Sequence, residues 1–367
     1  ILSGHDTLAL MPTGGGKSIT FQVPALANPG ICLVVSPLVA LMKDQVKNLQ
    51  KRGILSAFIS SEMPHWEILQ QLDNCILGDY KFLYISPERI SSELFQEKLK
   101  TLSRKVNLLV VDEAHCISQW GNDFRRDYRL IADIRDVIPH VQVIAVTASA
   151  TAAVVADICE QLHFRKGYRI FKTSFERKNL SFVVRKTDNK LKEICHILSA
   201  VPGSAVIYSR TRKGVEEYAG KLRAAGISAE YFHAGLDPVL KTERQADWVK
   251  GFTRVLVATN AFGMGIDKGD VRVVIHTEFP DSMEAYYQEA GRAGRDGKRA
   301  YAVALLGPQD ITDIKRRPSN AFPTIEYIKR VYEALCNRFQ IAEGDGEGVS
   351  VYLDEPEFLR DWHFDKG

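Results

Sequence analysis

The chain has 367 residues, of which 45% are hydrophobic, and its 48 basic and 45 acidic residues give a formal net charge of +3. Such a length favours two domains, because single cores stop growing at about 250–300 residues. The small charge excess does not indicate a polyanionic partner by itself. No apolar run is long enough for a transmembrane helix, and the first residues lack the order of a secretory signal. We therefore expect no membrane partner and an intracellular protein, in the cytoplasm or nucleoid if bacterial and in the nucleus if eukaryotic.

Six cysteines are scattered through the chain without a CxxC pair. Several stand in apolar runs, so they are predicted to be buried thiols in a reducing compartment. Cys336 is the only cysteine after Cys195. Because a structural zinc site needs about four Cys or His ligands, we expect no zinc cofactor in the C-terminal part.

Short β-branched runs alternate with helical patterns in the first half of the chain, which predicts a parallel α/β sheet. These runs cover residues 8–11, 31–36, 82–86, 108–112 and 143–147. The alternation then restarts, which predicts a second α/β domain. Its runs cover residues 205–209, 229–233, 254–259, 272–276 and 300–306.

The stretch between the two series is polar and charged from about residue 171 to 189, and we place the linker there. The alternation stops after Gln309. One amphipathic helix over 325–339 is followed by a stretch rich in Gly and acidic residues. The predicted organisation is a first domain over 1–176, a second over 177–308, and a partly helical C-terminal extension over 309–367 whose function the sequence does not indicate.

The segment MPTGGGKS at 11–18 lies between a predicted strand and a helix that begins near Lys17. In that context, backbone N–H groups and the positive helix end converge on phosphate, as in a P-loop. Lys17 would reach the β- and γ-phosphates of ATP, and Ser18 would bind Mg²⁺. Met11 replaces the first Gly of the strict pattern, so an ordinary Gly-rich turn is the alternative. The nucleotide-binding candidates are Thr13, Gly14, Gly15, Gly16, Lys17 and Ser18. Since the loop comes so soon after Ile1, we expect the natural chain to start upstream.

A second motif, DEAH at 112–115, ends the apolar run LLVV. It places Asp112 and Glu113 at the carboxyl edge of the sheet, where ligands bind in such folds. Asp112 suits Mg²⁺, and Glu113 suits a base that orients the attacking water. A surface charge pair is the alternative for DEAH alone. Together with the P-loop, the motif predicts an ATPase.

Two arginines three residues apart stand in QEAGRAGRDG at 288–297, in the second predicted domain. An arginine remote from the P-loop suggests an arginine finger, which stabilises charge on a transferring phosphoryl group. We expect Arg295, and then Arg292, to reach across to the nucleotide. A basic patch on a solvated helix is the alternative.

Four strings in order, MPTGGGKS, DEAHCISQWG, ATNAFGMGIDK at 258–268 and QEAGRAGRDG, closely resemble superfamily 2 helicases, and specifically the RecQ family of DNA helicases. The resemblance runs from about Leu8 to Leu306. It implies two tandem RecA-like domains, ATP with Mg²⁺, and single-stranded and duplex DNA as partners. It also implies movement from the 3′ toward the 5′ end of the loading strand, with duplex unwinding in DNA repair or recombination. Protein partners are not implied.

The same resemblance assigns further positions. SPLVALMKDQ at 36–45 and SPERI at 86–90 would touch phosphates of the strand, and TASAT at 147–151 would link the ATP and DNA sites. Gln288, in the motif of the two arginines, is a further catalytic candidate, and Asp267, a nucleotide-binding candidate, falls where the family couples nucleotide to domain closure. The implied strand-contacting residues include Ser36, Pro37, Ser209, Arg210, His233 and Thr259.

The segment CISQWGNDFRRDY at 116–128 gathers large rings directly after the carboxylates. Trp120 and Phe124 could stack on unpaired bases, and Arg125 could contact phosphate, which would connect DNA to the ATP site. The alternative is that these rings anchor a loop to the core.

Departures from the family pattern limit what the resemblance implies. Asn122 replaces a usual His, and Arg126 and Lys178 replace prolines. The family's four-Cys zinc subdomain has no counterpart here. Two other function classes stay open: another superfamily 2 machine, such as an RNA helicase or double-strand translocase, and a nucleotide-regulated binding protein.

Overall fold

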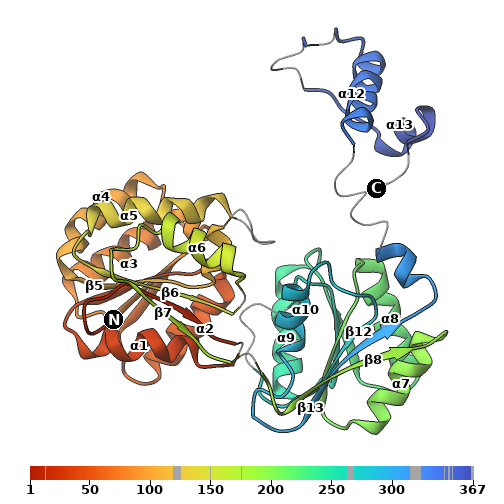
Figure 1. Cartoon of the computed structure of the whole chain (residues 1–367), viewed down its shortest axis with the longest axis horizontal. Helices are drawn as coiled ribbons and strands as arrows, with labels where there is room; N and C mark the ends of the chain where they lie inside the picture. The colour runs from red at the N-terminus through yellow and green to blue at the C-terminus, as the bar shows by residue number, and fades with distance from the viewer. Residues whose placement is uncertain are drawn as a thin grey trace. The chain divides into compact units, whose positions relative to one another are not determined.

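The computed structural model describes all residues except 13, 119–124, 149, 175, 263–267, 315–323, 343, 346–347, 349 and 365–367. The chain divides into two compact units. The large unit comprises residues 1–185 and 190–305, and the small unit comprises 186–189 and 306–367. Figure 1 shows the large unit as two sheets, each covered by helices on both faces.

The first sheet has seven strands in the order β3-β4-β2-β5-β6-β1-β7, and every neighbouring pair is parallel. Because parallel strands need crossovers, helices connect them, and buried strands read as continuous apolar runs. The strands are β1 Thr7–Leu10, β2 Ile31–Val35, β3 Ser56–Ile59, β4 Phe82–Ile85, β5 Val106–Val111, β6 Gln142–Thr147 and β7 Arg169–Lys172.

Alternate residues of these strands enter two separate cores, one on each face of the sheet. Leu33 and Val35 of β2 pack with α3, α4, α5 and α6, whereas Cys32 and Val34 pack with α1 and α2. Figure 1 shows the same division of helices between the two faces. The helices are α1 Lys17–Ala27, α2 Val39–Gln50, α3 His65–Leu77, α4 Glu93–Leu102, α5 Ile131–Val137 and α6 Ala152–Gln161, with short 3-10 helices η1 Pro87–Arg89, η2 Ser103–Lys105, η3 Ala114–Ile117 and η4 Arg126–Leu130.

The second sheet has six strands in the order β10-β11-β9-β12-β13-β8, and its pairs from β10 to β13 are parallel. Helices α7 and α8 pack on one face, and α9 and α10 on the other. The strands are β8 Leu180–Lys186, β9 Ser204–Tyr208, β10 Ala229–Phe232, β11 Val255–Ala258, β12 Val271–His276 and β13 Ala300–Leu306; the helices are α7 Lys190–Ala200, α8 Arg212–Ala224, α9 Pro238–Lys250 and α10 Met283–Ala290.

The prediction of two parallel α/β domains is confirmed, with each predicted strand found within a residue or two of its expected bounds. Three strands were not predicted: β3, β7 and β8. The last two occupy much of the stretch that the sequence predicted as a linker. They are the edges of their sheets, where most side chains are exposed, so their short apolar stretches, IF in β7 and FVV in β8, stand among charged residues and did not stand out as buried strands. The predicted boundary at 176 falls between them and stays a prediction.

The small unit contains α12 Ile325–Phe339, with the bounds that its apolar spacing predicts, and α13 Glu355–Asp361. Its core is a small cluster around Ala334, Phe358 and Phe364. Arg338 bonds Asp361 at 2.7 Å and also pairs with Glu357, which joins the two helices. No helix of the described residues has both the length and the apolar character needed to cross a membrane.

The predicted burial of the cysteines is right for four positions and wrong for two. Cys195 on α7 and Cys336 on α12 are half-buried, because they lie beside the residues of their helices that enter a core and not among them. Burial raises the pKa of Cys75 to about 12, so that thiol is inert as a nucleophile at neutral pH.

The first sheet is held at its amino edge by a buried charge cluster on Asp6. Its side chain is fully buried, accepts from Arg135 Nη2 at 2.6 Å and from Arg165 Nη2 at 3.0 Å, and also accepts from the backbone N–H of Val143 at 2.9 Å. Burial alone would raise the pKa of Asp6, but the bonds from Arg165, Val143 and Arg135 outweigh it and lower that pKa.

We expect Asp6→Asn to lower the free energy of unfolding by about 3–5 kcal/mol, since removing one partner leaves the buried Arg135 guanidinium uncompensated. The matched control is Asp73→Asn, which breaks an ion pair with Lys98 in which both side chains are partly exposed. That change should cost about 1 kcal/mol or less. Equal losses in urea unfolding would contradict the expectation. Because the folded-state pKa of Asp6 is lowered, its contribution is present above the ordinary pKa of 3.8 and is lost as pH falls through the lowered value.

Candidate functional site

The loop between β1 and α1 has a backbone that only glycine adopts easily. Gly14 and Gly16 have φ of 76° and 83°, in the left-handed region. A Cβ on Gly15 would lie 2.9 Å from the carbonyl oxygen of Pro12, so this position is closed to larger residues as well. Gly16 caps α1 without a side-chain acceptor for the N–H groups of its first turn. Such a helix start binds anions, and the loop therefore fits a phosphate group.

Lys17, the first residue of α1, bonds Glu113 directly: Nζ lies 2.8 Å from Oε1. Burial alone would lower the pKa of Lys17, but the charges of Glu113 and then Asp112 outweigh it and raise that pKa, while Arg295 acts in the opposite sense. The lysine is therefore a fixed cation beside the glycine loop, held by the carboxylate that follows β5.

The two carboxylates differ in their surroundings. Asp112 Oδ1 accepts from the backbone N–H of Glu113 at 2.9 Å, and Oδ2 accepts from Ser36 Oγ at 3.4 Å. Burial, followed by the neighbouring charge of Glu113, raises the pKa of Asp112 to about 6. A half-buried carboxylate of this kind, with the Ser18 hydroxyl in the first turn of α1, would supply the hard oxygen ligands that Mg²⁺ requires. The residues present thus fit ATP with Mg²⁺.

Glu113 has φ 45° and ψ 48°, a conformation that is costly for a residue with a side chain. It is held there by the 3-10 helix that begins at Ala114 and by the pairing with Lys17. Strain of this kind persists where the surroundings over-determine a conformation, and here it fixes the direction of a carboxylate at the sheet edge.

His115 connects the carboxylates to the next strand. Its Nδ1 lies 2.9 Å from Thr147 Oγ1, at the end of β6, and 3.5 Å from Glu113 Oε2. Sequence reasoning named the segment that begins at Thr147 but did not single out His115. The signal was available, because His115 is the fourth residue of the DEAH string.

The structure separates the two arginines that the sequence predicted together. Arg292 is buried, and its Nε donates to the Tyr208 hydroxyl at 2.7 Å. Arg295 lies against the glycine loop, with its Cγ 3.5 Å from the place that a Cβ of Gly14 would take. Only Arg295 is thus brought to the P-loop. The bond to Tyr208, the last residue of β9, directs the Arg292 side chain toward the core of the second sheet.

Four of the predicted DNA-contacting residues directly follow strands at the carboxyl edges of the two sheets: Ser36, Ser209, His233 and Thr259. All are buried, with exposed fractions between 2% and 7%. His233 Nε2 lies 3.0 Å from Glu216 Oε1. These side chains therefore support the sheet edge that a DNA strand would meet, and they expose little surface of their own to such a strand.

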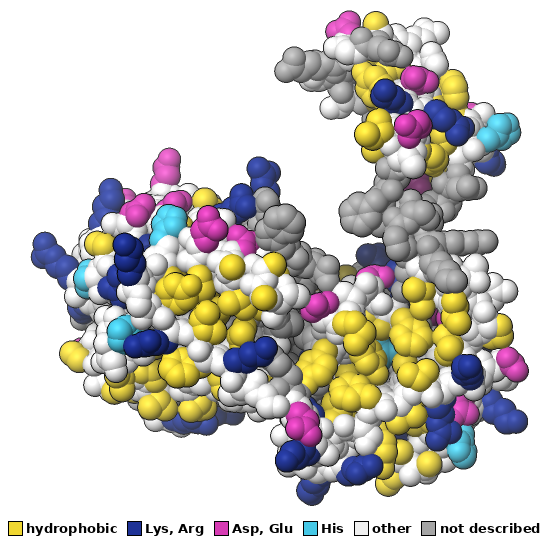
Figure 2. Space-filling model, in the orientation of Figure 1, with side chains coloured by type: hydrophobic (Ala, Val, Ile, Leu, Met, Phe, Trp, Pro, Cys, Tyr) yellow, Lys and Arg dark blue, Asp and Glu magenta, His cyan; other side chains and the backbone are white. Residues whose placement is uncertain are grey.

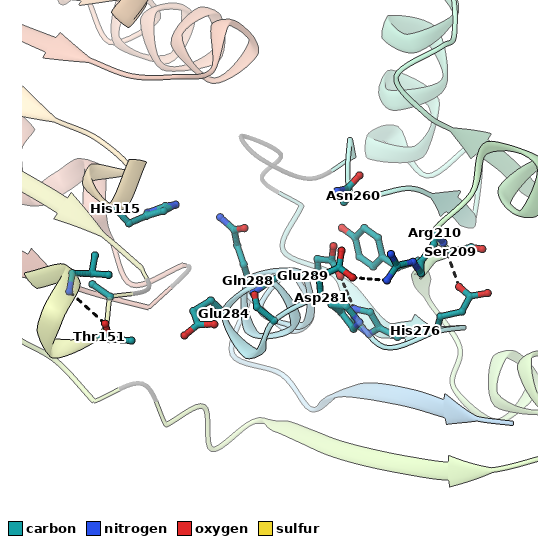
Figure 3. Close-up of a pocket in the computed structure, with 17 residues that line it drawn as sticks. His115, Thr151, Ser209, Arg210, Asn260, His276, Asp281, Glu284, Gln288 and Glu289 are labelled. Atoms are coloured by element: carbon teal, nitrogen blue, oxygen red, sulfur yellow. Dashed lines mark hydrogen bonds and ion pairs between the residues drawn. The ribbon is translucent and has the colours of Figure 1, made fainter. Parts of the chain in front are cut away.

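The other predicted contacts are more exposed or lie elsewhere. Arg210 pairs with Asp281, and Arg125 Nη1 donates to the carbonyl of Pro37 at 3.2 Å. Gln288, His115 and Arg210 line one cavity of about 630 Å³, and the paired His276 and Glu289 belong to the same lining (Figure 3). The predicted residues Thr13, Trp120, Phe124 and Asp267 lie outside the described part of the chain.

Basic side chains are scattered among acidic and apolar ones on the face drawn in Figure 2. That distribution agrees with the small net charge of +3. The described residues of this face form no broad basic patch, and the candidate nucleic-acid contacts are the strand-end residues.

Two family models match the chain. The model described as DEAD/DEAH box helicase matches residues 1–158, and the helicase conserved C-terminal domain matches residues 189–297. The "ATP-dependent DNA helicase RecQ" of Bacillus subtilis is 44% identical over 84% of this chain and 52% of its own length. The "ATP-dependent DNA helicase hus2/rqh1" of Schizosaccharomyces pombe is 41% identical over 93% of this chain and 27% of its own length. The chain thus spans about half or less of the length of these relatives.

Solved structures share the fold at lower identity. Mycobacterium smegmatis helicase Lhr bound to ssDNA and AMP-PNP aligns with a TM-score of 0.68 at 21% identity, over 85% of this chain and 45% of its own. Saccharomyces cerevisiae Dbp5 bound to RNA and ADP BeF3 aligns with a TM-score of 0.65 at 19% identity, over 88% of this chain and 84% of its own. These likenesses support two RecA-like domains and do not discriminate DNA from RNA.

Proposed function

Because the chain belongs to the RecQ family of superfamily 2 helicases, we propose that it hydrolyses ATP and uses the energy to move along DNA and separate its strands. The observation that carries the proposal is the cluster in which Lys17, Glu113 and Arg295 meet at the glycine loop. A binding protein would need the loop, but it would not need two adjacent carboxylates at the sheet edge and an arginine from the turn after α10.

Each residue of the cluster has a chemical role in this proposal. Lys17 holds the β- and γ-phosphates, and Ser18 with Asp112 holds Mg²⁺, which neutralises phosphate charge when bound. Glu113 orients the attacking water and accepts its proton. The hydrogen bond between His115 Nδ1 and Thr147 Oγ1 holds the His115 ring beside Glu113. Arg295 stabilises the charge that develops on the transferring phosphoryl group.

We propose DNA as the track because the relatives at 39–44% identity are named DNA helicases, whereas the fold alone also occurs in Dbp5 bound to RNA. Movement from 3′ to 5′ and a role in repair or recombination are finer proposals that rest on the family. They would place the protein where DNA is, in a nucleoid or nucleus. The lack of a zinc ion stays a prediction.

Strand separation tests the proposal directly. A labelled duplex carrying a 3′ single-stranded tail should be unwound with ATP, whereas the same duplex with a 5′ tail should not. Unwinding of the 5′-tailed duplex alone would refute the polarity. No unwinding of either, with ATP turnover intact, would favour a translocase that does not separate strands.

Arg125 joins the segment after the carboxylates to the first predicted DNA-contacting segment, through its bond to the Pro37 carbonyl. We expect Arg125→Ala to leave basal ATP turnover within about twofold and to weaken its stimulation by single-stranded DNA by roughly tenfold, since stacking and phosphate contacts each contribute on the order of 1–3 kcal/mol. Turnover with and without DNA should be measured beside thermal stability. If both rates fall together with the melting temperature, the residue is a core anchor and the coupling idea is wrong.

A further inference from the structure

Residues 291–298, which follow α10 and are called the arginine turn here, contain both Arg292 and Arg295. One side chain from the segment between the two sheets, Arg177, bonds the backbone of this turn and so acts as a clasp. Arg177 donates from Nη2 to the carbonyls of Ala293 and Gly294, both at 2.9 Å, and from Nη1 to the carbonyl of Gly291 at 3.3 Å. Carbonyls at the end of a helix lack partners within it, so a guanidinium that bonds three of them fixes the path of the chain.

Asn179 holds the same turn from two residues further along. Its Nδ2 donates to the carbonyls of Gly294 at 2.7 Å and Lys298 at 2.9 Å. The approach is so close that a Cβ on Gly294, where φ is 63°, would lie 2.6 Å from Asn179 Nδ2. Arg177 Nε also bonds Asn179 Oδ1 at 3.4 Å, so the two side chains form one clasp. Arg295 stands directly after the residue that both of them hold.

The other end of this segment is bonded to the strand that leads into the glycine loop. Thr173 donates to the carbonyl of Leu10, the last residue of β1, from its backbone N–H at 3.0 Å and from Oγ1 at 3.3 Å. The six steps from Thr173 to Asn179 span at most about 20 Å of extended chain. One short segment is therefore bonded at one end beside the loop that holds phosphate and at the other beside the arginine that faces it.

We propose that Arg177 and Asn179 are positioning residues for Arg295, and that the segment 173–179 connects the P-loop strand to the arginine turn. The inference rests on the proposed ATPase and deepens it. Arg177 and Asn179 need not touch the nucleotide, since they act by fixing the backbone from which Arg295 projects. A small displacement of a group that contacts the transition state lowers kcat far more than it lowers substrate binding.

A purely structural role is the alternative, and the chain contains its own comparison. Arg254 also uses one guanidinium to bond three carbonyls, those of Gly203 at 3.1 Å, Val201 at 3.0 Å and Leu198. It precedes β11, at the amino edge of the second sheet, and the three carbonyls that it holds lie between the last turn of α7 and β9, outside the arginine turn. Arg254 therefore offers a clasp of the same chemistry that bonds no carbonyl of the arginine turn and reaches it only indirectly, through Gly203 and the pairing of Arg272 with Asp296.

The test compares Arg177→Lys with Arg254→Lys in the whole chain. Lysine keeps the charge but cannot bond three carbonyls in a fixed fork. We expect Arg177→Lys to lower the kcat of DNA-stimulated ATP turnover by roughly tenfold or more while KM for ATP changes by less than about threefold. Arg254→Lys should lower the melting temperature about as much as Arg177→Lys does, but it should leave kcat per folded molecule within about twofold of wild type.

A double variant separates positioning from stability. If Arg177 acts through Arg295, adding Arg177→Lys to Arg295→Ala should reduce kcat no further, since the group being positioned is already gone. Asn179→Ala provides a second single variant with the same expected pattern. Multiplicative losses in the double variant, or equal kcat losses for Arg177→Lys and Arg254→Lys, would overturn the inference. Wild-type protein without any ATP turnover would refute the proposed function instead.

Discussion

Replacing Lys17 with Ala should abolish ATP turnover, by at least about a thousandfold, while the chain remains folded. The side chain contributes charge at the loop more than packing, because its Nζ bonds Glu113 and its 14% exposed fraction leaves it open to a ligand. The loss of the cation leaves Glu113 with the contact from His115 Nδ1 at 3.5 Å, so we expect some fall in melting temperature without unfolding.

The matched control for this variant is Lys98→Ala, which removes a lysine bonded to Asp73 at 2.6 Å on the other face of the first sheet from α1. Turnover per folded molecule should stay within about twofold of wild type, since Lys98 has no connection to the loop. Phosphate release should be measured at saturating ATP and single-stranded DNA. Unchanged turnover in Lys17→Ala would end the motor hypothesis.

Replacing Glu113 with Gln should stall hydrolysis by on the order of a thousandfold and leave nucleotide binding intact. The amide keeps the size of the side chain and its position after β5, but it cannot accept the proton of the attacking water. Binding of a fluorescent ATP analogue with Mg²⁺ should therefore match wild type within about threefold, while single-turnover hydrolysis nearly stops.

Asp112→Asn gives the contrasting result that makes the assignment specific. This variant should lose Mg²⁺-dependent nucleotide binding, because the Asp112 carboxylate is the proposed metal ligand. If Glu113→Gln loses nucleotide binding and Asp112→Asn retains it, the two roles are reversed.

Much of the site was predictable because glycines and apolar runs mark where its helices and strands begin and end. The start of α1 at Lys17 follows from the left-handed Gly16, and the position of Asp112 follows from the end of the run LLVV. The assignment of that edge to a RecQ-type helicase came from whole strings of residues. A glycine loop alone could be an ordinary turn, and a charge pair alone could be a surface pair.

The rest depended on contacts between residues far apart in the chain. The string QEAGRAGRDG ranked Arg295 ahead of Arg292 but predicted that both reach the nucleotide, because it does not show the bond that holds Arg292 on Tyr208. Equally, Arg177 stands in a polar stretch that carries no periodic signal, and its importance appears only when the carbonyls it holds are known. The burial of Ser36 and His233 could not be foreseen from motifs that mark them only as strand ends.

The central claim is that DNA drives ATP hydrolysis at the Lys17 and Glu113 site, and one measurement tests it most directly. ATP turnover by the wild-type chain should be measured with no nucleic acid, with single-stranded DNA, with duplex DNA and with single-stranded RNA of the same sequence. We expect the greatest stimulation with single-stranded DNA, and loss of that stimulated rate in Arg295→Ala. Greater stimulation by RNA than by DNA, or a rate that no nucleic acid changes, would contradict the central claim.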